Sequence, residues 1–120
     1  MVYSIVKYDV LLSDGANEFI EELDIKMRAK TMRTIGLLEE FGPLLSEPHT
    51  RKIKGIKGLF ELRIKLSNNI VRLFYFHIRD RIYIITSGYI KKDNKLKKSE
   101  IEKAVKIMTE IKEKFNNETS

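Results

Sequence analysis

The sequence contains no cysteine among its 120 residues. This excludes disulfide bonds, thiolate metal ligands and a cysteine nucleophile, and it fits a reducing compartment. No apolar run approaches the ~20 residues that span a bilayer. Residues 1–10 lack the apolar stretch and the small-residue cleavage site of a signal peptide. We therefore expect a cytoplasmic protein without a membrane segment, with residues 1–120 forming a single domain.

Familiar catalytic motifs are also missing. The chain has two histidines, His49 and His77, and neither has a second histidine or a cysteine at the spacing of metal ligands. No P-loop, dinucleotide-binding glycine pattern or Ser/His/Asp arrangement is present. We therefore expect no metal and no cofactor. His49 lies in a basic loop and could touch a substrate, although an ordinary exposed histidine is the simpler interpretation.

Positive charge is abundant and unevenly distributed. The chain has 23 Lys and Arg against 17 Asp and Glu, and its net charge is +6. Residues 51–98 hold fourteen Lys and Arg against three acidic residues, whereas residues 13–40 hold seven acidic residues against four basic ones. A basic second half indicates a polyanionic partner, most simply a nucleic acid. The alternative is a surface of solvated lysines.

The first half predicts one strand followed by helices. Residues 3–10 favour a short strand, and Ser13 or Asp14 can cap the helix that follows. Apolar residues then recur at helical spacing over residues 19–27 and 32–41, and a Gly-Pro pair ends the second stretch. One bent helix and a helical hairpin both fit this pattern.

The second half predicts strands and a last helix. Residues 44–58 are expected to form a loop because Pro and Gly interrupt them. Ser99 and Glu102 match a capping box that begins an amphipathic helix. The order predicts an α+β fold, a small antiparallel-rich sheet with N-terminal helices and a C-terminal helix packed on one face. The three consecutive strands are expected over residues 59–66, 70–76 and 81–89.

Cations collect on one face of the predicted hairpin. A two-residue loop at 68–69 places Lys65 opposite Arg72, and a loop at 67–68 places Arg63 opposite Arg72. Both registers put the three cations on one face, because the registers differ by an even shift, whereas a three-residue loop would separate them. Facing cations are unfavourable. We therefore expect an exposed cationic face that binds an anion.

Phe74 and Phe76 share that face, and cations interleaved with aromatic rings suit single-stranded RNA. RNA cleavage can work with Arg and Lys alone, because the 2′-OH attacks its own phosphate and cations stabilise the charge that develops. A lysine crowded by other cations has a lowered pKa and can act as a base. The alternatives are that the arginines pair with helix carboxylates such as Glu21, Glu22 or Glu40, and that the two phenylalanines pack under the last helix.

Several segments, taken together, match one protein family. They are Gly58-Leu59-Phe60-Glu61-Leu62-Arg63, Val71-Arg72-Leu73-Phe74-Tyr75-Phe76, Gly88-Tyr89-Ile90-Lys91-Lys92 and Ser99-Glu100-Ile101-Glu102-Lys103-Ala104, preceded by residues 37–43 and 47–49. In this ordered series the chain resembles the HigB-type, phage-derived-protein-like branch of the RelE/ParE toxin superfamily. The resemblance extends roughly over residues 5–112.

The resemblance implies a compact RelE-like fold and the toxin of a type II toxin–antitoxin system. Such a toxin is a metal-independent endoribonuclease that cuts messenger RNA on the ribosome and inhibits translation. Its partners would be the ribosome, mRNA and a helix-turn-helix antitoxin in a hetero-oligomer. The alternatives are a ParE-type inhibitor of DNA gyrase, because a fold does not fix a function, and a non-catalytic nucleic-acid-binding protein.

The resemblance also implies roles for particular residues. Arg63 matches a substrate-binding cation, Arg72 the arginine that stabilises the transition state, and Lys91 or Lys92 the basic position after the last strand. Arg72→Ala should then remove toxicity and leave the fold intact. Better-known RelE members have a lysine at the position of Glu61, which is a speculative candidate here for acid or base, and a tyrosine near Ile101. Further RNA contacts are expected from Lys52, Lys54, Lys57, Lys65 and Lys95.

Overall fold

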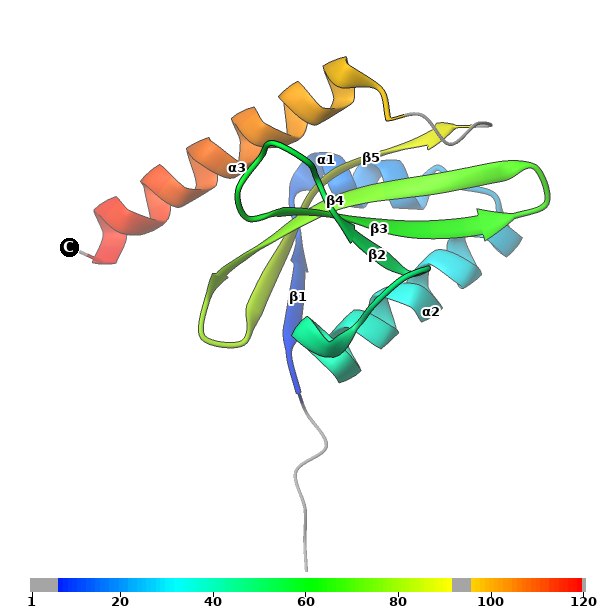
Figure 1. The fold of residues 1–120 in the computed structure, drawn as a ribbon, viewed down its shortest axis with the longest axis horizontal. Coiled ribbons are helices and arrows are strands. Elements are labelled where there is room, and N and C mark those ends of the chain that lie inside the picture. Colours follow the sequence, from blue (N-terminus) through cyan, green and yellow to red (C-terminus); the bar gives the residue numbers. More distant parts are fainter. Residues whose placement is uncertain (1–6, 92–95, 120) are drawn as a thin grey trace, which may run out of the picture.

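The computed structural model describes residues 7–91 and 96–119, which form a five-stranded mixed sheet with helices on both faces (Figure 1). The strand order is β1-β5-β4-β3-β2, with β1 parallel to β5 and the other neighbours antiparallel. The α+β prediction is confirmed. The elements are β1 (Asp9–Leu12), α1 (Asp14–Glu21), α2 (Ile25–Phe41), the 3-10 helix η1 (Gly42–Leu44), β2 (Thr50–Lys52), β3 (Leu59–Leu66), β4 (Asn69–Arg79), β5 (Ile82–Lys91) and α3 (Lys98–Thr119).

Capping residues divide the first helical stretch into two helices. The Ser13 hydroxyl accepts a hydrogen bond from the Ala16 N–H at 3.1 Å, and the Asp24 carboxylate accepts one from the Met27 N–H at 2.8 Å. A second cap inside the stretch starts a new helix, because it satisfies N–H groups that a continuous helix would pair internally. The first strand begins at Asp9, and residues 3–6 of the expected strand lie outside the described residues.

Two cores lie on opposite faces of the sheet. On one face α1 and α2 cover Leu62, Leu73 and their neighbours, and on the other α3 covers Phe74 and Phe76. The prediction that all helices share one face is wrong. The physical reason is β4, in which buried apolar residues alternate to both faces, so both faces need a cover. The alternative interpretation of the two phenylalanines, packing under the last helix, is confirmed.

The β3–β4 hairpin uses one of the two predicted registers. Arg63 lies opposite Arg72 and Leu66 opposite Asn69, so the loop consists of residues 67–68. Preceding this hairpin, the expected loop over 44–58 contains the edge strand β2, which pairs with β3. Three residues are too few to show the alternation that identifies a strand in a sequence.

The start of α3 differs from the capping-box prediction. The helix begins at Lys98, so Ser99 lies inside its first turn and is not the cap. Just before the helix, the N–H of Lys97 donates a hydrogen bond to the Tyr89 hydroxyl at 3.0 Å. Ala104 and Met108 of this helix are buried against the sheet. Among the described residues, no helix combines the length and hydrophobicity needed to cross a membrane.

Candidate functional site

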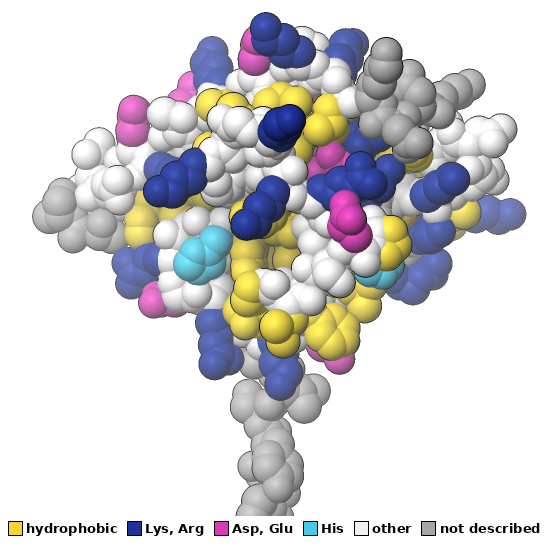
Figure 2. Space-filling view, viewed as in Figure 1, with side chains coloured by type: hydrophobic (Ala, Val, Ile, Leu, Met, Phe, Trp, Pro, Cys, Tyr) yellow, Lys and Arg dark blue, Asp and Glu magenta, His cyan; other side chains and the backbone are white. Residues whose placement is uncertain are grey.

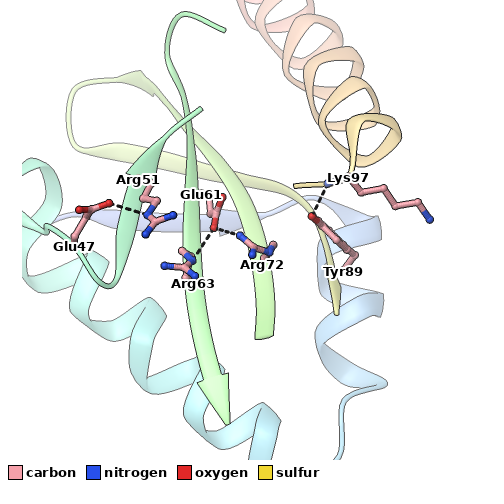
Figure 3. Close-up of polar contacts among 7 residues, drawn as sticks. All are labelled: Glu47, Arg51, Glu61, Arg63, Arg72, Tyr89 and Lys97. Carbon is pink, nitrogen blue, oxygen red and sulfur yellow. Dashed lines mark hydrogen bonds and ion pairs between the residues drawn. The ribbon is translucent and has the colours of Figure 1, made fainter. Parts of the chain in front are cut away.

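Basic and acidic side chains meet on the α3-side face of the sheet. One row across the strands runs from Arg63 on β3 to Arg72 on β4 and Tyr89 on β5. The next row places Arg51 of β2 opposite Glu61 of β3. Residues two apart on a strand share a face, so the two rows lie side by side. Figure 3 shows these side chains converging between β2 and the start of α3.

The carboxylate of Glu61 joins the two arginines of this site. Its Oε1 atom forms an ion pair with Nε of Arg63 at 3.0 Å and accepts a hydrogen bond from Nη1 of Arg72. Glu61 is 1% exposed and Arg72 is 0% exposed, whereas the Arg63 side chain retains 14% exposure. A charge is tolerated away from water when it is paired and hydrogen-bonded. Glu61 thus supplies each of the two arginines with a buried anionic partner.

Arg63 lies in the most cationic part of the site. Its burial and the nearby charge of Arg51 lower the pKa of Arg63, while Glu61 opposes the shift. Arg51 itself is exposed and pairs with the Glu47 carboxylate at 2.7 Å. Arginine remains protonated in proteins, so Arg63 carries its positive charge in partly buried surroundings beside a second cation.

Tyr89 connects the arginine row to α3. Its ring stacks on Phe74 with centroids 6.0 Å apart, and its hydroxyl accepts the hydrogen bond from Lys97. Burial raises the pKa of Tyr89, whereas the bond from Lys97 and the charge of Arg72 oppose that shift. The tyrosine thus fixes the beginning of the helix beside the buried ion pairs (Figure 3).

Four of the predicted lysines lie on or near this face. Lys65 and Lys91 occupy the next row, on either side of Ile70, with Lys65 exposed and Lys91 half-buried. Lys54 and Lys57 are exposed on the loop between β2 and β3. The structure therefore brings Lys65 and Lys91 close to the arginines and leaves the other two on a neighbouring surface.

The remaining predicted residues are elsewhere. Lys52 follows Arg51 along β2 and so points to the opposite face, where it lines a cavity with Phe60 and Tyr75. Lys92 and Lys95 lie outside the described residues. The set expected from the sequence is thus divided between the two faces of the sheet.

The expectation of an exposed cationic face is wrong for Arg72, which is completely buried. The anion expected between the facing arginines is at least in part Glu61, a strand residue rather than one of the helix carboxylates in the alternative interpretation. Alternation along the strand puts Glu61 and Arg63 on one face, which was the available signal for the pair. Arg51 and Tyr89 were missed, because only the register across β2 and β5 reveals them.

The histidines do not join the ion-pair cluster. The His49 carbonyl accepts the Arg63 N–H at 2.8 Å, and His49 helps to line a cavity of about 210 Å³ beside Arg63 and Lys65. The His77 ring lies against Tyr83 on the other face of the sheet. In the part of the chain that the structure describes, no three His, Asp or Glu side chains gather as metal ligands would.

Solved structures share this fold. A mutant of the E. coli toxin RelE in the free state matches with a TM-score of 0.54 and 18% identity, covering 68% of this chain and 81% of that one. A chain of the archaeal RelE–RelB complex from Pyrococcus horikoshii OT3 matches with a TM-score of 0.50 and 18% identity, covering 68% and 92%. The predicted RelE-like fold is confirmed.

Sequence comparison places the chain in a family. No curated protein matches it significantly. The family model described as "Phage derived protein Gp49-like (DUF891)" matches residues 18–109, which include α2, the whole hairpin with its ion pairs and half of α3. The chain therefore belongs to the phage-derived protein Gp49-like family.

Proposed function

We propose that this protein is the toxin of a type II toxin–antitoxin system, a HigB-type member of the RelE/ParE superfamily that cleaves mRNA on the ribosome in the cytoplasm. The observation that carries the proposal is the partly open Arg63 beside the buried carboxylate of Glu61, on a RelE-like sheet. The solved E. coli protein is named a toxin, and the P. horikoshii RelE was crystallised with RelB. We infer the same kind of role for this chain.

In the proposed reaction the ribose 2′-OH attacks the adjacent phosphorus and forms a 2′,3′-cyclic phosphate, while the 5′-oxygen leaves and takes a proton from water. Arg63 contacts the scissile phosphate and stabilises the negative charge of the phosphorane. As Arg63 turns toward the phosphate, the Glu61 carboxylate is uncovered and accepts the 2′-OH proton. Arg72 is a positioning residue, because it is buried and reaches RNA only through the carboxylate it holds.

Lysines complete the proposed RNA surface. Lys91, the last residue of β5, and Lys92, the next in the sequence, neutralise the phosphates next to the cleaved bond. Lys54, Lys57, Lys65 and Lys95 contact phosphates of mRNA or ribosomal RNA farther along. The site offers few groups for acid–base catalysis. We therefore expect the cleavage rate to depend on the ribosome, which positions the mRNA for attack. A helix-turn-helix antitoxin would form a hetero-oligomer that covers this basic face.

Induced expression of Arg63→Ala tests the site. Wild-type protein should arrest translation and leave cut transcripts, and the variant should cleave about 100-fold more slowly, because a donor to the transition-state phosphate is lost. Lys26→Ala is the matched control, since it also removes one cation but from an exposed position of α2, on the other face of the sheet. The measurement is transcript-end mapping together with growth after induction, with thermal melts to confirm that both variants fold.

Other outcomes separate the alternatives. Intact transcripts during growth arrest would contradict the nuclease, and a gyrase supercoiling assay would then test the ParE-type activity. Salt-sensitive binding to ribosomes without any cut RNA would indicate a non-catalytic binding protein. A small helix-turn-helix protein encoded in the adjacent reading frame would support the proposed antitoxin.

A further inference from the structure

A cavity of about 650 Å³ opens on the face of the sheet opposite to the ion pairs. Its walls come from β2, β3, β4 and β5 and from the residues around η1. Figure 2 shows a hollow with hydrophobic side chains below a band of Lys and Arg, with a histidine at its side. The residues used below are the aromatic Tyr8, Phe60, Tyr75 and Tyr83 and the polar Lys52 and Arg81.

The aromatic rings form a continuous wall. Phe60 and Tyr75 are stacked, with centroids 5.4 Å apart and planes at 20°. Tyr83 meets both Tyr75 and Tyr8 edge to face, each at 5.8 Å. The Tyr75 hydroxyl is held by the Thr50 hydroxyl at 2.5 Å. Rings fixed in this way offer a planar ligand both a face and edges to pack against, without loss of side-chain freedom.

The polar part of the lining is cationic. Lys52 and Arg81 contribute two exposed positive charges. The acidic lining residue, Asp80, pairs its carboxylate with Nε of Arg79 at 3.1 Å. Within residues 7–91 and 96–119, no ion pair joins Lys52 or Arg81 to a carboxylate. The cavity thus combines an aromatic wall with positive charge that is not neutralised locally.

We propose that this cavity binds one nucleotide, with its base against the aromatic wall and its phosphate between Lys52 and Arg81. Base stacking on aromatic rings and phosphate binding by cations are the two interactions that proteins use for unpaired nucleotides. The volume lies within the ~300–1,000 Å³ of small-molecule sites. An apolar side chain of a protein partner would use the rings but leave both cations without an anion.

The position of the cavity suits one nucleotide of an RNA strand. This part of the proposal rests on the proposed function. β2 is the edge strand of the sheet, and its neighbours Arg51 and Lys52 point to opposite faces. A strand crossing this edge can place one nucleotide in the cavity and the following ones near Arg63. A free mononucleotide has the same chemistry, so the experiment distinguishes the two sources.

The test is an NMR titration of the isotope-labelled protein with nucleoside 5′-monophosphates and with a short 2′-O-methyl oligoribonucleotide. The oligonucleotide lacks the 2′-OH nucleophile and so cannot be cut. Amide signals of the cavity residues should shift. Lys52→Glu should weaken binding about tenfold, and Phe60→Leu should do the same through lost stacking. Lys106→Glu makes the same charge change at an exposed position of α3, on the opposite face of the sheet, and should weaken binding less than about threefold.

Shifts of the cavity signals by monophosphates assign the site to free nucleotides, and shifts by the oligonucleotide alone assign it to RNA. Either result supports the proposal. Cavity signals that respond to neither, or equal weakening by Lys52→Glu and Lys106→Glu, overturn it, as do signals that respond only to an antitoxin protein. Arg63→Ala should leave cavity binding unchanged, so loss of the proposed nuclease activity and loss of this site remain distinguishable.

Discussion

Arg72 and Glu61 are opposite charges held where neither contacts water. Taking two ions out of water is expensive, and their attraction repays the cost only when the contact is close and other hydrogen bonds complete it. Here one carboxylate oxygen serves two guanidinium groups. Removing one partner leaves a buried charge incompletely compensated, so each residue depends on the other.

Arg72→Met should therefore destabilise the fold by about 3–5 kcal/mol, contrary to the expectation that an Arg72 substitution spares it. The Glu61→Gln, Arg72→Met double variant should lose less than the single variant, because it leaves no buried carboxylate that has lost one of its two cations. Urea unfolding followed by circular dichroism measures both. Arg63→Met is the control and should cost less, since its side chain is partly exposed. Equal losses for the two single arginine variants would contradict the assignment.

At the residue scale, the sequence places Glu61 and Arg63 on one face by simple alternation. It could not show that Arg72 is buried, because Lys and Arg in a strand usually face solvent. Arg72 lies between its neighbours on the adjacent strands, Arg63 of β3 and Tyr89 of β5, and these neighbours follow from the strand pairing. The resemblance to the family indicated both arginines. That Glu61 pairs with both of them is evident only from the structure.

Turns decide which face each side chain of the hairpin occupies. The β3–β4 loop consists of Ser67 and Asn68, and Ser67 has a φ of 55°. Since Asn68 is not among the described residues with positive φ, the loop matches the turn in which the first central position favours glycine. Serine at that position is strained, because its Cβ approaches the backbone.

Ser67→Gly should raise stability by about 0.5–1 kcal/mol by removing this strain. Asn68→Gly is the matched control. It introduces the same residue one position later, where φ is not positive, and should be neutral or destabilising. Thermal melts of the two variants and the wild type give the comparison. A higher melting temperature for Asn68→Gly than for Ser67→Gly would show that the turn is of another kind.

At the element scale, α2 and β3 are predicted from a clear apolar period, whereas β4 is an apolar run between two turns that extends to Arg79, three residues beyond the expected end. The sequence leaves the hairpin register open between two even-shifted choices, since both put the same residues on the same face. β2 was missed because of its three-residue length. The start of α3 differs from the predicted one. The N–H of Lys97 bonds to the hydroxyl of Tyr89, a strand residue outside the capping motif that the prediction used.

The whole molecule holds tyrosines on both faces of the sheet. Burial raises the pKa of Tyr75 to about 12, partly opposed by its bond with Thr50. Burial also raises the pKa of Tyr83 and that of Tyr89. Tyrosines of the unfolded chain lose their protons near pH 10. From there to about pH 12 the unfolded chain holds fewer protons than the folded one, so stability must fall as pH rises.

Tyr75 alone should contribute a loss of up to about 3 kcal/mol across this range. Tyr75→Phe should be less stable than wild type at pH 8, by about 1 kcal/mol for the lost hydrogen bond, yet should lose less stability between pH 8 and pH 11.5. Urea unfolding at several pH values measures the difference. If both proteins lost stability equally with pH, the Tyr75 hydroxyl would not be protected by the fold.

The fold class at the whole-molecule scale was correctly predicted from the element order, but the layers were not. Period and capping identify helices, whereas the face each helix covers depends on long-range packing. The alternation of buried residues along β4 to both faces was the available sign that a second cover is needed.

Arg51 and Lys52, two consecutive basic residues of the edge strand β2, lie on opposite faces of the sheet. A slip of this strand by one residue would exchange their sides, yet each side would still receive a cation. Positive potential along this border is therefore insensitive to small insertions or deletions in the preceding loop, while the reach and shape of the group presented on each side would change.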